Sequence, residues 1–221
     1  MVTEQHSKLI EFIWSIAERL RGPYRPPQYR KVMLPLIVLR RLDMVLEDGK
    51  DDVRAEHDRL KIQKMSDDTI NRTLAEFVRK TRGVSFFNTG PYTFKTLLDD
   101  PEGLSANLAA YINAFSPNVR DIFEKFKFEA EIVVLDEKNR LYNIIKEFAD
   151  PRIDLHPDRV SNLQMGYIFE HLIRRFNEQA NEEAGDHFTP REVITLMAHL
   201  LYTKDEDVYR EHIAKTIYDP A

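Results

Sequence analysis

Cysteine is absent from this chain of 221 residues. Its absence excludes a disulfide-stapled scaffold, a cysteine-ligated zinc site, an iron–sulfur protein and a cysteine nucleophile. The 7 histidines are scattered, and they form no HExxH motif or other paired ligand spacing. We therefore expect no metal site, and any chemistry must be carried by other residue types.

Long apolar runs are missing as well. The longest covers residues 32–39, far short of the about 20 residues that cross a membrane. Glu4 and Glu11 stand among the apolar residues of the N-terminus, which argues against a signal peptide. We therefore expect a cytosolic protein that has no membrane contact.

The chain also lacks an excess of positive charge, since 32 Lys and Arg face 37 Asp and Glu for a net charge of −5. This balance excludes a protein coated with basic residues for nucleic-acid binding, but it leaves room for a local basic patch. Residues 19–41 contain no acidic residue, and their cations are Arg19, Arg21, Arg25, Arg30, Lys31, Arg40 and Arg41.

Two interpretations of this basic stretch are open. Tyr24 and Tyr29 interleave with its cations, and Arg21, Arg25, Arg30 and Lys31 are the candidates for contacts to DNA phosphates. The same pattern also fits a solvated helix face that is balanced by the acid-rich residues 43–58.

Glycine is scarce, with 7 residues, and helical periodicity dominates the chain. Apolar residues at positions 9, 13, 16 and 20 form the stripe of a first helix that Gly22 and Pro23 end. Further helices are predicted at about 28–46 with Pro35 inside, from Ser66 onward with Ser66 as the N-cap, and at 94–99, 104–115, 118–127, 129–135, 137–149, 160–180 and 190–202. The core stripe predicted for the helix at 160–180 comprises Met165, Phe169, Leu172 and Phe176. Trp14 lies off the main stripe of the first helix, so it either faces a partner or is covered by a neighbouring helix. The pattern predicts an all-α body over residues 1–150.

A second unit is predicted to begin at residue 157, after a proline-containing linker at 150–157. Its helices are followed by a short β-prone stretch at 215–219. Because a lone strand needs neighbouring strands for stability, we expect the chain to be a fragment of a longer protein.

The strongest local motif is residues 185–192, GDHFTPRE. Thr189 suits a helix N-cap, Pro190 the first helical position, and Glu192 completes a capping box. A helix N-terminus of this kind can hold a carboxylate or phosphate, and Phe188 could enclose an organic ligand. A well-capped helix that binds nothing explains the same residues.

Residues 185–201, GDHFTPREVITLMAHLL, resemble a segment of the modification (HsdM) subunits of type I restriction–modification systems. That segment precedes the cofactor domain and has the pattern G-x-x-F/Y-T-P-R. Residues 161–176 resemble the family's preceding helix, and residues 86–98 and 107–116 resemble parts of its N-terminal helical domain. The similarity runs through nearly the whole chain, and its motifs follow the order of the family.

The resemblance implies an all-α fold for residues 1–150, a helical N-terminal domain that clamps DNA and docks other subunits. Residues 157–221 would form the first helices and first strand of a truncated Rossmann-like, S-adenosylmethionine-dependent methyltransferase domain. The full-length subunit would methylate the exocyclic amine of adenine in the prokaryotic cytoplasm. Its implied partners are double-stranded DNA, the specificity (S) subunit, the restriction (R) subunit and a second copy of the modification subunit.

The resemblance also assigns S-adenosylmethionine contacts to residues of the GDHFTPRE motif and to Asp219, which begins the family's D-P-A-C-G-x-G motif. The contacts within the GDHFTPRE motif are Asp186, His187, Phe188, Thr189, Pro190 and Arg191. His187 departs from the family, which has an aromatic residue there. The catalytic Asn-Pro-Pro-aromatic motif does not occur, so we expect no catalytic residue here and no activity of this chain alone. The alternative is a non-catalytic helical adaptor that binds protein or DNA.

Overall fold

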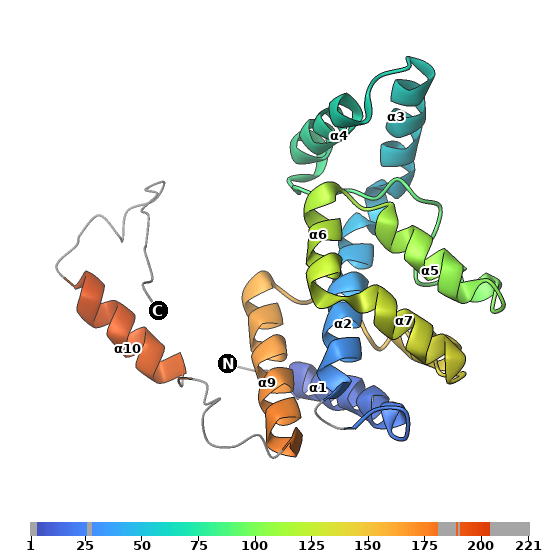
Figure 1. The fold of residues 1–221 in the computed structure, drawn as a ribbon. Coiled ribbons are helices and arrows are strands. Elements are labelled where there is room, and N and C mark those ends of the chain that lie inside the picture. Colours follow the sequence, from blue (N-terminus) through green and yellow to red (C-terminus); the bar gives the residue numbers. More distant parts are fainter. Residues whose placement is uncertain (1–3, 26–27, 181–188, 190, 204–221) are drawn as a thin grey trace. The chain divides into compact units, whose positions relative to one another are not determined.

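The computed structural model describes residues 4–25, 28–180, 189 and 191–203 (Figure 1). The chain divides into two compact units, residues 1–181 and 182–221. The described residues contain helices and no strand, which confirms the predicted all-α class; the β-prone stretch 215–219 lies outside them. The helices are α1 (Glu4–Ala17), η1 (Glu18–Leu20), α2 (Tyr29–Leu46), η3 (Glu47–Gly49), α3 (Lys50–Ile62), α4 (Asp67–Arg82), η4 (Thr96–Asp99), α5 (Leu104–Asn113), α6 (Pro117–Phe126), α7 (Phe128–Glu137), α8 (Leu141–Phe148), α9 (Asn162–Ala180) and α10 (Arg191–Tyr202).

Most predicted helices are present, and three differ from the prediction. Helix α3 was not predicted, because few of its residues are apolar and many are charged. The helix expected at 94–99 is a single 3-10 turn, η4. Helix α8 begins at Leu141 and not at 137, because Asn139 adopts a left-handed backbone conformation with φ of 53° that ends the preceding helical run.

Helix α2 is the centre of the first unit (Figure 1). It contacts α6, α7, α8 and α9. Its residues Val32, Met33, Leu36, Ile37 and Leu39 are fully buried. The helix continues through Pro35, although this proline cannot donate the backbone hydrogen bond of its turn.

Helix α9 packs into the same core, against α1 and α2. Its predicted apolar stripe is confirmed, since Met165, Leu172 and Phe176 are buried and Phe169 packs against them. Trp14 of α1 is 6% exposed, and its ring lies 5.1 Å from that of Phe176. Of the two interpretations of a tryptophan off the main stripe of α1, coverage by a neighbouring helix is the one observed.

The first unit therefore extends past the linker at 150–157 and ends after α9. Arg41 of α2 holds this linker in place. Its guanidinium donates to the carbonyl oxygens of Leu155 and Val160, the latter at 2.7 Å, and to Oδ1 of Asn162 at 3.1 Å.

Helices α3 and α4 form an antiparallel pair with a small core of its own (Figure 1). This core comprises Val53, Leu60, Ile70, Leu74, Val78 and Phe87. Ser66 caps α4 as predicted, since its Oγ accepts a hydrogen bond from the backbone N–H of Thr69.

Helix α10 belongs to the second unit and is described by itself. It carries an apolar face whose side chains are 43% to 73% exposed. The face comprises Val193, Ile194, Leu196, Met197, Leu200 and Leu201. A face of this size is typical of a helix that further protein covers.

Candidate functional site

The candidate cofactor segment is described only in part. Thr189 is exposed and lies just ahead of α10, which begins at Arg191 and has Glu192 in its first turn. Asp186, His187, Phe188, Pro190 and Asp219 lie outside the described residues. Their assignment to a cofactor pocket stays a prediction.

The four candidate DNA contacts, Arg21, Arg25, Arg30 and Lys31, are all exposed. Nη2 of Arg21 lies 2.5 Å from Oε2 of Glu18, and this hydrogen-bonded ion pair raises the pKa of the arginine above its ordinary value. Exposure is what a phosphate contact requires, but it does not by itself test for DNA binding.

Two cations of the basic stretch have structural roles instead. Arg41 bonds the linker, as described above. Nη1 of Arg40 lies 3.1 Å from Oδ2 of Asp43, and its guanidinium lies over the ring of Phe94, 5.7 Å from the centroid. Both partners of the Arg40–Asp43 pair are almost fully buried, so Arg40 is not available to DNA.

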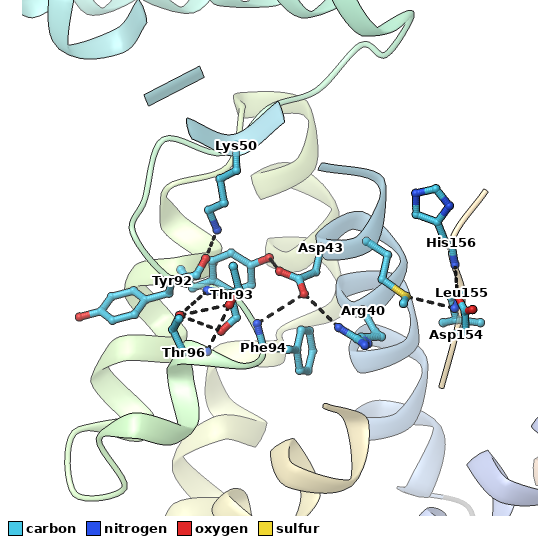
Figure 2. Close-up of polar contacts among 12 residues, drawn as sticks. Arg40, Asp43, Lys50, Tyr92, Thr93, Phe94, Thr96, Asp154, Leu155 and His156 are labelled. Carbon is cyan, nitrogen blue, oxygen red and sulfur yellow. Dashed lines mark hydrogen bonds and ion pairs between the residues drawn. The ribbon is translucent and has the colours of Figure 1, made fainter. Parts of the chain in front are cut away.

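Asp43 is the centre of a buried polar cluster between α2, α5 and the loop before η4 (Figure 2). Its Oδ1 accepts a hydrogen bond from the Tyr111 hydroxyl at 2.7 Å. Its Oδ2 accepts from Arg40 and, at 3.4 Å, from the backbone N–H of Phe94. Burial and the adjacent carboxylate raise the pKa of Tyr111 well above its ordinary value, so its hydroxyl remains a donor.

Lys50 belongs to the same cluster, since it contacts Tyr92 and Tyr111. Its Nζ donates to the carbonyl oxygen of Tyr92 (Figure 2) and lies over the ring of Tyr111, 4.7 Å from the centroid. Burial lowers the pKa of Lys50 to about 8, although Asp43 acts in the opposite direction. A partly buried ammonium of this kind makes stability depend on pH.

We expect the stability of the wild type to rise relative to that of Lys50→Met between pH 8 and pH 10. Unfolded Lys50 keeps its proton up to about pH 10.4, whereas the folded protein releases it above about pH 8. The unfolded state therefore binds more protons in this window, and the folded state gains stability as pH rises. Urea unfolding at each pH should show a relative gain of about 1–2 kcal/mol, since the amine is only partly desolvated. A constant difference between the two proteins would contradict the prediction.

The loop at 86–94 carries motifs that resemble the HsdM family, and the structure gives these residues a structural role. Asn88 is buried, its Nδ2 donates to the Tyr111 carbonyl at 2.9 Å, and its Oδ1 accepts from the Gly90 N–H at 2.8 Å. A Cβ atom at Gly90 would lie 2.8 Å from that of Ala114, so only glycine fits. The loop is thereby fixed to the C-terminal end of α5, and it positions the groups that bond Asp43.

Within the described residues, no group of three or more His, Asp or Glu side chains is placed to hold a metal ion. No helix in this part of the chain is long and apolar enough to cross a membrane.

Comparison with known families identifies the first unit. Residues 9–148 match the sequence profile of the HsdM N-terminal domain. The chain belongs to this family. The HsdM N-terminal domain thus comprises α2 to α8 and most of α1, and it includes the Asp43 cluster and the basic stretch.

A second profile, described as N-6 DNA Methylase, matches residues 161–221. It begins with α9, which packs into the core of the HsdM N-terminal domain. The chain is 22% identical over 242 residues to the type I restriction enzyme MjaIX methylase subunit of Methanocaldococcus jannaschii. This match covers 95% of the chain but 38% of that relative. No solved structure matches the chain.

Proposed function

We propose that this chain is the N-terminal part of the methylating subunit of a type I restriction–modification complex. The observation that carries the proposal is the order of the two profiles, an HsdM N-terminal domain at 9–148 followed by an N-6 DNA Methylase at 161–221. The exposed apolar face of α10 supports it, because the remainder of a methyltransferase domain would cover that face.

In this proposal the complete subunit transfers a methyl group from S-adenosylmethionine to the exocyclic amine of an adenine that has been flipped out of duplex DNA. Its partners are the specificity subunit, the restriction subunit and a second methylating subunit. The present chain supplies DNA and subunit contacts and one wall of the cofactor pocket, and it has no activity alone. Thr189 suits that wall, since it is exposed ahead of the N-terminus of α10, where free N–H groups attract a carboxylate.

The test is a methylation assay on the complete subunit assembled with its specificity subunit. Labelled S-adenosylmethionine should deliver its methyl group to adenine in duplex DNA. In a separate titration, Thr189→Ala should weaken cofactor binding by about 5- to 30-fold, because the variant loses one or two hydrogen bonds to the cofactor. Thr203→Ala removes the same hydroxyl from the far end of α10 and should leave the affinity unchanged.

Two results would contradict two separate parts of the proposal, the role of Thr189 and the methylase function. An affinity of Thr189→Ala equal to that of the wild type would exclude Thr189 from the pocket while leaving the methylase function in place. Absence of adenine methylation in the assembled wild type would favour the non-catalytic adaptor.

A further inference from the structure

A cavity of about 250 Å³ lies between η1 and the beginning of α8. Its lining comprises Glu18, Arg19, Arg21, Arg140, Asn143 and Ile144. The cavity therefore brings two cations of the basic stretch together with Arg140, which lies more than a hundred residues further along the chain. The sequence pattern gives no sign that Arg140 lies close to the basic stretch in space.

The three guanidinium groups of the cavity differ in their partners. Arg21 is paired with Glu18 at 2.5 Å, and Nη2 of Arg19 lies 2.9 Å from Oε1 of Glu147. Arg140 is exposed and forms no ion pair with any residue in the described part of the chain. Each guanidinium has five N–H donors, so even the two paired arginines keep donors for a further acceptor.

The charge of the cavity favours an anion. Three arginines face two glutamates, and the first turn of α8 contains no acidic residue. A volume of about 250 Å³ is far more than one water needs, and it is enough for a phosphate group. Planar guanidinium groups match the oxygens of a phosphate in a fork geometry.

We propose that this cavity, through Arg140, Arg21 and Arg19, binds a phosphate of the DNA backbone. The assignment rests on the proposed function, in which DNA is the substrate. A duplex fits better than a single carboxylate of a partner protein, because exposed Arg25, Arg30 and Lys31 follow Arg21 in the same acid-free stretch. A row of phosphates can engage several such cations at once.

The experiment measures DNA affinity against salt concentration in the assembled complex, with Arg140→Ala, Arg140→Lys and wild type. Loss of one phosphate contact should lower the slope of log K against log salt by about 0.9. Arg140→Lys keeps the charge and should retain most of the slope. Arg72→Ala is the matched control, since it removes an exposed arginine from α4, and it should leave the slope unchanged. Thermal unfolding of each variant verifies that the fold is intact.

Two outcomes would overturn the assignment. One is an unchanged slope and affinity in Arg140→Ala. The other is unchanged DNA binding together with weaker subunit assembly, which would assign the cavity to an acidic group of a partner protein. Methylation by the wild type is measured alongside, so a failure of the methylase function itself appears in the wild type and is distinguishable.

Discussion

Asp43→Ala should lower the free energy of unfolding by about 3–5 kcal/mol, the cost of leaving one member of a buried ion pair without its partner. The side chain of Arg40 is 12% exposed and that of Asp43 9%, so little solvent reaches the guanidinium that loses the carboxylate. The Tyr111 hydroxyl and the Phe94 N–H would lose their acceptor in the same change. Urea unfolding measures the loss.

Asp51→Ala is the matched control for Asp43→Ala. Asp51 is 99% exposed and lies 3.9 Å from Arg54, so its removal should change stability by less than about 0.5 kcal/mol. Tyr111→Phe alone should cost about 1 kcal/mol. The double variant Asp43→Ala/Tyr111→Phe should lose less than the sum of the two, because both changes break the same bond. A loss in Asp43→Ala no larger than that of the control would contradict the buried cluster.

The helical class and most helix positions could be predicted from local sequence, because apolar periodicity and capping residues act within a few positions. The predicted core stripe of α9 and the Ser66 cap are confirmed on these grounds. Helix α3 was missed by the same reasoning, since it buries little more than Val53 and Leu60. Its partner α4 stabilises it, and that contact is not a local property of the sequence.

The polar contacts could not be predicted, because they join distant parts of the chain. Arg40 and Arg41 were indistinguishable in the sequence from Arg25 and Lys31, yet the former are bonded to Asp43 and to the linker. The cavity around Arg140 likewise requires η1 and α8 to be adjacent. Charge runs indicate candidate DNA contacts, but only the fold shows which cations already have acidic or carbonyl partners.

Helix α9 packs in the helical unit, although the profile of the methylase domain matches it. The N-6 DNA Methylase profile begins at 161, but α9 contributes Ile168, Leu172 and Phe176 to the core of the helical unit. Arg175 of α9 adds two contacts to α1, an ion pair with Glu11 at 2.6 Å and a position over the Trp14 ring, 4.3 Å from its centroid. Because of these contacts, we expect α9 to unfold together with the HsdM N-terminal domain.

Phe176→Ala should accordingly destabilise the helical unit by about 3–5 kcal/mol, the usual cost of removing a fully buried aromatic ring. Trp14 is the only tryptophan of the chain, and its ring packs on that of Phe176. Its emission therefore reports the contact directly. In the variant, the emission should shift toward that of solvated tryptophan, and its urea transition should move to lower concentration together with the circular dichroism of the helices.

Phe126→Ala is the control, because Phe126 is 37% exposed on α6 and its truncation should cost about 1 kcal/mol or less. If Phe176→Ala left the Trp14 transition at the wild-type midpoint, α9 would be stabilised independently of the helical unit. A coincident shift of both signals would instead mean that the first helix matched by the methylase profile is held by the HsdM N-terminal domain. Any displacement of that domain by DNA would then move α9 with it.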